Sequence, residues 1–361
     1  MYKRALEVLN KFHDNGYLAY IVGGYPRDAL LGIHTKDIDI CTNAKPMEIM
    51  KLFNTESVTD IKYGSVRVIY KNYVFDVTTF RKDIKYEDNR KPVKIRYINN
   101  LKNDLLRRDF TINTICIDKD GNYIDLLNAM EDINSRVIKC VGNSKYKLRE
   151  DVLRILRAIR FASLLDFNIE QNTEKYIVKY GYLLEKLSNS RKKEELDKIF
   201  SSIKRENARD MIVKYGLDKY LGINNINDIV LCDDIIGVWS QLDLSIDYPF
   251  TKTEREHMQK IRNMLGLELN NYNVYKYGLY VSSVVGSIKG VSYKKINDIY
   301  KSLKIYSLSD INIKAMDIAR ILDREPGKYL NDIFNDLEKK IVNNEINNTY
   351  EDICNYILKN Y

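Results

Sequence analysis

The 361-residue sequence predicts an α+β fold, with a small mixed sheet in the N-terminal part and helices through the rest. Residues 17–125 contain short runs rich in β-branched and aromatic residues, separated by turn signals and two helical patterns. After about residue 150, apolar residues recur three and four positions apart, which is typical of amphipathic helices. The N-terminal pattern by itself is also compatible with an α/β arrangement.

The expected elements begin with a helix over residues 1–16, which ends at Asn15-Gly16. Strands are expected at residues 18–22, 37–41, 66–70, 74–80 and 112–117, with helices at 27–31 and 46–53. Further helices are expected at residues 151–165, 171–186, 191–200 and 206–215, and the remainder is mostly helical.

Composition indicates a globular chain without a membrane span. Hydrophobic residues make up 45% of it and charged residues 30%. No apolar run approaches the roughly 20 residues of a membrane helix, and the N-terminus does not resemble a signal peptide. The 5 cysteines are widely spaced, which fits a cytoplasmic location and argues against disulfides and a structural zinc site.

The positive charge is unevenly distributed along the chain. The net charge is +8, but residues 221–361 carry 17 basic and 19 acidic residues. Residues 1–220 carry 41 and 31, a net of +10. Chemistry on a polyanion is therefore expected in the N-terminal three-fifths.

The first segment that predicts a chemical function is residues 21–42, which contains a pair of glycines. Gly23 and Gly24 follow a predicted strand and let the backbone turn sharply and approach a ligand closely. Pro26 suits the first turn of a helix, whose free N–H groups and positive dipole end suit a triphosphate. Arg27 adds a guanidinium for phosphate oxygens. Alone, the pattern also fits a bare tight turn.

Two aspartates separated by one residue follow on the next predicted strand. Asp37 and Asp39 would project from the same strand face, while Ile38 points into the core. Carboxylates this close repel unless a cation lies between them, so the pair predicts a Mg²⁺ site. Asp76, on a predicted neighbouring strand, is the candidate third acid. Local pattern alone leaves open that these are solvated surface acids.

A cluster of polar residues precedes and enters the fifth predicted strand. Arg108 offers a guanidinium to phosphate oxygens, while Asp109 and Asn113 have groups that could bond ribose hydroxyls. The combination indicates a ribonucleotide site, although an ordinary salt-bridged corner fits the same residues.

A basic helix after residue 150 supplies a candidate base reader. Asp151 and Arg154 are three residues apart and therefore neighbours on one helix face, and Arg157 and Arg160 continue the spacing. A carboxylate beside a guanidinium matches the amine and acceptor of cytosine or adenine, and not the edge of guanine or uracil. Alone, the segment also fits a basic helix with internal ion pairs.

Together these segments resemble the class II tRNA nucleotidyltransferases, the CCA-adding enzymes, which share their catalytic core with bacterial poly(A) polymerases. The resemblance lies in five ordered motifs, GGYPRD, DID, TTFR, RRDFTIN and EDVLRILR, and in a further helix, SNSRKKEELDKIF. It covers residues 21–200, and nothing specific is recognised beyond about residue 220. Pro26 and Thr114 depart from the family pattern without removing a functional group.

The resemblance implies a nucleotidyltransferase head domain of the DNA polymerase β superfamily, followed by helical neck, body and tail regions. Asp37 and Asp39 would hold Mg²⁺ and, with Asp76 as supporting acid, form the catalytic group. Asp151 and Arg154 would select CTP and then ATP. The full set of nucleotide-binding residues would be Gly23, Gly24, Arg27, Arg108, Asp109, Asn113, Asp151, Arg154, Arg157 and Arg160.

The expected domains are a catalytic head at residues 1–140, a helical neck with the base-reading helix at 141–220, and an RNA-binding body and tail at 221–361. The expected reaction is Mg²⁺-dependent addition of C-C-A to tRNA 3′ ends from CTP and ATP. It needs no nucleic-acid template and releases pyrophosphate.

Several alternatives stay open at this point. A CC-adding enzyme would lack part of the segment between TTFR and RRDF, but residues 82–106 look full length, which favours complete CCA addition or A addition. A poly(A) polymerase would tend to carry a strongly basic tail, whereas this C-terminal part is slightly acidic. A non-catalytic tRNA-binding protein would have lost an acid or a base-reading residue, and none is missing.

Overall fold

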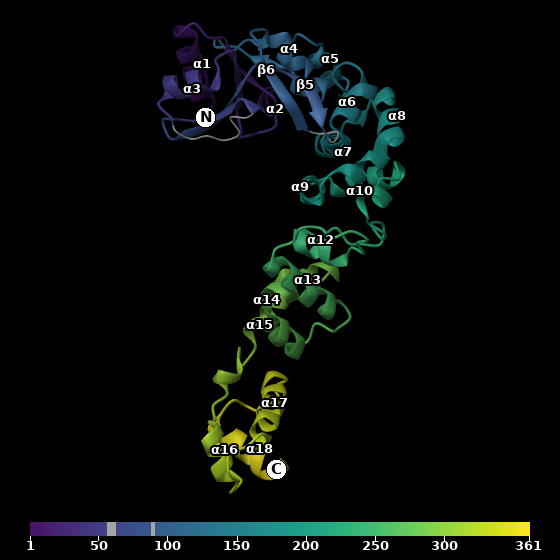
Figure 1. The fold of residues 1–361 in the computed structure, drawn as a ribbon. Coiled ribbons are helices and arrows are strands. Elements are labelled where there is room, and N and C mark those ends of the chain that lie inside the picture. The colour runs from purple at the N-terminus through teal and green to yellow at the C-terminus, as the bar shows by residue number, and fades with distance from the viewer. Residues whose placement is uncertain (56–62, 88–90) are drawn as a thin grey trace. The chain divides into compact units, whose positions relative to one another are not determined.

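The computed structural model describes residues 1–55, 63–87 and 91–361 (Figure 1). Contacts divide the chain into two compact units. The first comprises residues 1–227 and 244–249, and the second comprises residues 228–243 and 250–361. In Figure 1 the first unit runs from purple to teal, and the second from green to yellow.

A mixed sheet lies at the centre of the N-terminal part of the first unit, in the strand order β3-β4-β2-β1-β7-β8. Strands β2 and β4 are parallel, and the other neighbours are antiparallel. The small mixed sheet predicted from the sequence is therefore confirmed. Its strands are β1 (Ala19–Val22), β2 (Asp39–Thr42), β3 (Ser65–Tyr70), β4 (Tyr73–Thr79), β7 (Cys116–Ile117) and β8 (Tyr123–Ile124).

Side chains alternate between the two faces along each strand, and different helices pack against each face of this sheet. One face, with Ile21 and Ile40, packs against α1 (Tyr2–Asp14) and α3 (Pro46–Phe53). The other face, with Val22 and Cys41, packs against α4 (Leu101–Leu106). Asp39 lies two residues before Cys41 on the same strand, so its side chain projects from the same face of the sheet, the face covered by α4.

A separate antiparallel pair follows the sheet, formed by β5 (Arg81–Glu87) and β6 (Lys91–Tyr97). Both strands belong to the segment between TTFR and RRDF whose length favours complete CCA addition. Residues 88–90 of that segment lie outside the described part of the chain.

Helices dominate the rest of the first unit, as predicted. The two short strands β9 (Val137–Ile138) and β10 (Asn168–Ile169) pair in parallel beside them. The helices are α2 (Gly24–Leu30), α5 (Ala129–Asn134), α6 (Ser144–Glu150), α7 (Leu153–Leu165), α8 (Gln171–Tyr180), η3 (Gly181–Lys186), α9 (Asn189–Phe200), α10 (Arg205–Lys214) and α11 (Asp218–Leu221).

The second unit is helical. One apolar cluster includes Ile261 and Val285, and another includes Ile318, Leu337 and Ile353. Within the described ranges, no helix has both the length and the apolarity needed to cross a membrane. The helices are α12 (Ile235–Gln241), α13 (Lys252–Leu265), α14 (Asn271–Ile288), α15 (Tyr293–Lys301), η4 (Leu308–Asp310), α16 (Ala315–Ile321), α17 (Tyr329–Val342) and α18 (Tyr350–Asn360).

The strand predicted at residues 112–117 is wrong in its first half. Thr111–Asn113 form a 3₁₀ turn, η2, and only Cys116–Ile117 pair with the sheet. The Thr114 hydroxyl donates to the carbonyl oxygen of Thr111 at 2.7 Å. Side-chain bonding of this kind to nearby backbone competes with strand pairing.

Candidate active site

The turn between β1 and α2 brings the glycine pair against the second aspartate. Gly23 has φ +86°, and a Cβ there would lie 3.2 Å from Asp39 Oδ2 and 3.9 Å from Arg108 Nη1. The backbone conformation therefore favours glycine, and any side chain here would also have to displace the Asp39 carboxylate by a few tenths of an ångström. A Cβ on Gly24 would meet Arg27 Nη2 at 3.5 Å, an ordinary contact distance. Helix α2 begins at Gly24, two residues before the start expected at Pro26.

Two of the three acidic residues lie on neighbouring parallel strands. Asp39 is the first residue of β2 and is in register with Asp76 in the middle of β4, so the third acid lies beside Asp39 on a neighbouring strand, as expected. Asp37 precedes β2, so the expectation that both members of the DID motif project from one strand is wrong. The Asp76 carboxylate also accepts a hydrogen bond from Arg67 Nε at 3.2 Å.

The pKa of Asp39 is affected by the neighbouring acidic residues. Burial raises the pKa of its carboxyl, the Arg108 guanidinium acts in the opposite direction, and the charges of Asp76 and Asp37 raise it further. The net shift of the Asp39 pKa is upward, mainly because its carboxyl loses hydration, and the charges of Asp76 and Asp37 add to it.

Arg108 is held beside this group by a buried aspartate at the end of α4. Arg108 Nη2 lies 3.3 Å from Asp104 Oδ2, and Arg107 Nε lies 2.8 Å from Asp104 Oδ1. Burial alone would raise the pKa of Asp104, but the two guanidiniums more than offset it and lower the pKa. The Nε of Arg108 is buried without a hydrogen-bond partner among the described residues. Asp104 thus fixes Arg108 and leaves one of its donors unused.

A second network joins η2 to α2 and α7. Asp109 Oδ2 accepts from Arg157 Nε at 2.8 Å and from Arg157 Nη2 at 2.6 Å. Asn113 Nδ2 donates to Asp109 Oδ1 at 3.1 Å, and Asn113 Oδ1 accepts from Arg27 Nη1 at 2.6 Å. The structure therefore brings together four predicted nucleotide-binding residues in one buried chain of bonds. Arg27 is also paired with Asp28 at 2.6 Å.

The predicted base-reading pair lies where α7 begins. Asp151 lies just before α7, not on the helix face expected from the sequence, and its Oδ1 accepts from the backbone N–H of Leu153 at 3.1 Å. Arg154 Nε lies 3.9 Å from Asp151 Oδ2, so the two side chains are neighbours. Arg154 also donates to the carbonyl oxygens of Lys147 at 2.9 Å and Arg107 at 3.1 Å. These two bonds fix the guanidinium in place.

Arg160 is supported from α9, within the SNSRKKEELDKIF segment. Its Nε lies 3.1 Å from Glu195 Oε2, and the Glu195 side chain is only 4% exposed. Arg160 Nε and Glu195 Oε2 are close enough to form an ion pair, but they are not aligned for a hydrogen bond. Glu195 Oε1 accepts from Lys198 Nζ at 3.1 Å.

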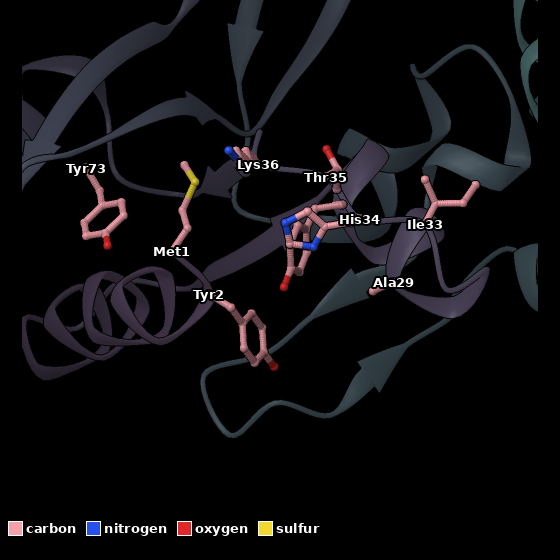
Figure 2. A pocket seen from close by; sticks show the side chains of 9 residues that line it. Met1, Tyr2, Ala29, Ile33, His34, Thr35, Lys36 and Tyr73 are labelled. Atoms are coloured by element: carbon pink, nitrogen blue, oxygen red, sulfur yellow. The ribbon is translucent and has the colours of Figure 1, made fainter. Parts of the chain in front are cut away.

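A hollow of about 710 Å³ is lined in part by residues 33–36, the segment that directly precedes the DID motif (Figure 2). Its wall includes the stacked rings of Tyr2 and Tyr25, whose centroids are 5.6 Å apart. None of its nine described lining residues is a predicted site residue, and Lys36 lies next to Asp37 in the chain. The predicted nucleotide-binding groups therefore lie outside this hollow. The lining residues are Met1, Tyr2, Tyr25, Ala29, Ile33, His34, Thr35, Lys36 and Tyr73.

The acidic group fits a magnesium ion better than a metal that needs a complete protein cage. Across residues 1–55, 63–87 and 91–361, no three His, Cys, Asp or Glu side chains are arranged to hold a metal by themselves. Mg²⁺ commonly takes one or two carboxylates, with water and substrate phosphates completing its shell. Asp37 and Asp39 supply such oxygens, and the repulsion felt at Asp39 favours a cation beside them.

Local sequence pattern missed three residues that hold the site together. Glu195 and Phe161 contact arginines that lie far away in the sequence, Arg160 and Arg27, whereas Asp104 contacts Arg107 and Arg108, three and four residues later. Phe161 forms part of the apolar pattern of α7, so its sequence signal is the same as that of a core residue. Asp104 and Glu195 lie in charged stretches, and only the fold shows that they are buried.

Three family models match successive parts of the chain. The poly A polymerase head domain matches residues 19–139, and the probable RNA- and SrmB-binding site of polymerase A matches residues 166–222. A putative tRNA nucleotidyltransferase domain 2 matches residues 239–357. With the mixed sheet and its paired aspartates, these matches define the chain as a nucleotidyltransferase.

Similar proteins then identify the family. A CCA-adding enzyme of Enterococcus faecalis is 30% identical over 389 residues, covering 99% of this chain and 96% of that protein. One from Lactococcus lactis is 32% identical over 382 residues, covering 96% and 94%. The crystal structure of the Bacillus stearothermophilus CCA-adding enzyme in complex with CTP superposes with a TM-score of 0.87 at 25% identity, covering 99% and 97%. The chain belongs to the CCA-adding enzymes, a family of tRNA nucleotidyltransferases that generally depend on a divalent metal.

Proposed function

We propose that this chain adds C-C-A to tRNA 3′ ends from CTP and ATP without a nucleic-acid template, releasing pyrophosphate. The observation that carries the proposal is the register of Asp39 with Asp76 beside the Gly23 turn and Arg108. This arrangement combines an acidic group with a backbone turn and a guanidinium for phosphates. The names of the curated relatives and the CTP complex of the Bacillus stearothermophilus enzyme support the same reaction.

Asp37 and Asp39 are the proposed ligands of Mg²⁺, with Asp76 as the supporting acid. When bound there, Mg²⁺ would act as a Lewis acid for the terminal ribose hydroxyl and the triphosphate. Asp76 neighbours Asp39 in register and contributes negative charge that favours a cation at the site. The bond from Arg67 orients the Asp76 carboxylate.

The triphosphate is proposed to lie against the β1–α2 turn. Gly23 and Gly24 let the backbone approach it, and Arg27 and Arg108 supply guanidiniums for its oxygens. The buried Nε of Arg108, without a partner among the described residues, supports this role. Because Gly23 lies close to both Asp39 and Arg108, the phosphates and the carboxylates would meet at one place.

Sugar and base are proposed to be read from η2 and α7. Asp109 and Asn113 are the proposed ribose ligands, and each also orients one arginine. Asp151 would accept from the exocyclic amine of cytosine or adenine, and Arg154 would donate to the neighbouring acceptor. The bonds of Arg154 to two backbone carbonyls hold its guanidinium still, which favours a fixed reader. Arg157 and Arg160 would help to hold base and triphosphate.

The remaining helices are proposed to bind the tRNA. Residues 141–220 would form the neck and residues 221–361 the body and tail, after a head at residues 1–140. Matches to an RNA-binding region of polymerase A and to a tRNA nucleotidyltransferase domain support this division. A cytoplasmic location, expected from the cysteine spacing, belongs to the same proposal, and all 5 cysteines are free thiols.

The proposal is tested by supplying each nucleotide separately. The protein is incubated with Mg²⁺ and with tRNAs that end in C-C, in C or before the first C, together with one labelled nucleotide at a time. We expect CTP to label the two shorter tRNAs and ATP to label the tRNA ending in C-C. Incorporation of UTP or GTP at a rate comparable to CTP and ATP would contradict the proposed base selection.

The same experiment separates the alternatives. Long A tails on unstructured RNA would identify a poly(A) polymerase, and failure of one of the two nucleotides would identify a CC-adding or A-adding partial enzyme. Absence of any incorporation with intact tRNA binding would favour a non-catalytic tRNA-binding protein.

A further inference from the structure

The ring of Phe161 is surrounded by three guanidinium groups. Phe161 lies in α7 and is 7% exposed. The guanidinium carbon of Arg160 lies 4.7 Å from its ring centroid, and those of Arg27 and Arg157 both lie at 5.2 Å. All three distances are within the range of a cation–π interaction.

These arginines come from two separate elements. Arg27 belongs to α2, which follows the glycine turn, whereas Arg157 and Arg160 belong to α7. Three positive groups around one side chain repel one another. Burial and the neighbouring charges of Arg157 and Arg27 lower the pKa of Arg160, although Glu195 acts in the opposite direction. The pairing carboxylates are Asp28 for Arg27, Asp109 for Arg157 and Glu195 for Arg160.

The carboxylates and the ring differ in how many of these arginines they contact. Asp28, Asp109 and Glu195 lie on three different segments, and each forms an ion pair with only one of the three arginines. Asn113 and Asp109 link Arg27 to Arg157, but Arg160 is bonded outside this network, to Glu195. Among the described residues the ring lies within cation–π distance of all three guanidiniums, and the negative potential of an aromatic face attracts each of them. Phe110 meets the Phe161 ring edge-on, with centroids 6.0 Å apart and an interplanar angle of 79°, which fixes its orientation.

We propose that Phe161 is a positioning residue for nucleotide binding, whose ring gathers Arg27, Arg157 and Arg160 into one cationic group before the nucleotide arrives. The inference rests on the proposed function, in which these arginines contact the nucleotide. Without the ring, Arg160 would keep only its pairing with Glu195, Arg27 and Arg157 would be linked only through Asn113 and Asp109, and the nucleotide would have to order the three guanidiniums. That ordering would weaken nucleotide binding.

A variant that preserves the shape of the ring gives the sharpest test. Replacing Phe161 with pentafluorophenylalanine keeps a six-membered ring but reverses the electrostatic potential of its face. The dissociation constant for CTP is measured in the absence of tRNA, so that no turnover is needed. We expect binding about tenfold weaker than in the unmodified protein, measured at a temperature at which both proteins are fully folded. Unchanged CTP affinity would overturn the role of the ring.

A double-mutant cycle distinguishes this inference from the function on which it rests. Phe161→Leu and Arg27→Gln are measured singly and together for CTP affinity. We expect each to weaken binding and the combined loss to be smaller than the product of the two, because both act through Arg27. Independent effects, with the losses multiplying fully, would overturn the role of Phe161. An Arg27→Gln variant with normal affinity would instead contradict the nucleotide contact of Arg27 in the proposed function.

Phe12→Leu is the matched control for loss of a buried ring. Phe12 is fully buried in the core between α1 and the sheet and packs on Phe53, with centroids 5.0 Å apart. We expect this variant to lose stability but to bind CTP with unchanged affinity. If Phe12→Leu and Phe161→Leu weaken CTP binding equally, the effect at Phe161 is one of packing, and the proposal fails.

Discussion

Asp109 is the residue on which the polar network of the site converges. Its carboxylate receives two bonds from Arg157, one from Asn113 and one from the backbone N–H of Phe110. Burial alone would raise its pKa, but the Arg157 charge and the bond from Asn113 hold the pKa far below the ordinary aspartate value. The folded state therefore stabilises the ionised form of the Asp109 carboxyl.

Asp109→Asn should reduce the free energy of unfolding at pH 7 by about 3 kcal/mol, because it leaves the buried Arg157 without its charged partner. The stabilisation by Asp109 is fully present above the unfolded pKa of about 4 and is lost as the pH falls toward the lower folded pKa. The difference between wild type and variant should therefore shrink below about pH 4.

Urea unfolding at pH 7, 5 and 3 measures this difference. The control is Asp120→Asn, because the Asp120 side chain is 61% exposed and should affect stability little. A difference at Asp109 that stays constant down to pH 3 would contradict a carboxylate held ionised by the fold.

Base choice should depend on Asp151 and not on acidic charge in general. Asp151→Asn replaces an acceptor with a group that also donates, so we expect UTP incorporation relative to CTP to rise at least about fivefold. The matched control is Asp166→Asn at the C-terminal end of the same helix, whose partner is Lys204 at 3.4 Å. Relaxed selection in both variants, or in neither, would remove Asp151 from the base-reading role.

At the scale of elements, the β1–α2 turn links the sheet to the site. Gly23→Ala would strain a residue at φ +86° and press a methyl group against Asp39 Oδ2. We expect a loss of about a hundredfold in kcat/KM, because small displacements of reacting groups have effects of this size.

Gly16→Ala is a matched control for the strain at Gly23. Gly16 has φ +80°, but a Cβ there meets nothing within 4 Å. It should lose stability from the same backbone strain and keep its kcat/KM once the fraction folded is equal. Equal losses of activity in both variants would mean that strain, and not contact with Asp39, decides the outcome.

Local pattern predicted the elements up to β4 to within two residues, except α2, which begins three residues before the expected range, and it did not predict α4, β8, α5 or β9. Helix α3 was predicted in full, and β1 to β4 were predicted from their β-branched and aromatic residues. Strands β5 and β6 were missed because charged residues interrupt their alternation. The strand predicted from Asp37 begins at Asp39, and the η2 turn was missed. At η2 the hydroxyl of Thr114 bonds the backbone of Thr111, and such bonding leaves no periodic signal in the sequence.

The sequence predicted which residues form the site, but not the contacts that hold their side chains in position. The motifs predicted that Asp39 and Asp76 would be neighbours, and their register confirms this. Contacts such as Arg27 to Asn113, which are 86 residues apart in the chain, follow only from the fold. The same is true of the three arginines around Phe161.

At the scale of the whole molecule, the basic excess lies in the part that contains every site residue. Residues 1–220 have a net charge of +10 and residues 221–361 a net charge of −2. Several of the arginines in the first part are proposed to bind the nucleotide triphosphate, so the total overstates the charge available to tRNA. Lys294 and Lys295, at the start of α15, are exposed and belong to the acidic part.

The affinity for tRNA should fall with rising salt, and the exposed lysines of α15 should contribute little to that dependence. We expect Lys294→Gln with Lys295→Gln to leave the slope of log K against log salt unchanged. A lysine that contacts phosphate contributes about one unit to this slope. A decrease approaching two units, measured by filter binding, would instead place α15 on the tRNA.

The central claim is that the acidic group at β2 and β4 performs complete CCA addition. Its most direct test is sequencing the 3′ ends of a tRNA without CCA after incubation with CTP, ATP and Mg²⁺. We expect the unmodified protein to yield ends that stop at C-C-A, and Asp39→Asn to reduce their formation roughly a thousandfold with tRNA binding intact. Full activity of Asp39→Asn, or ends that do not stop at C-C-A, would contradict the account.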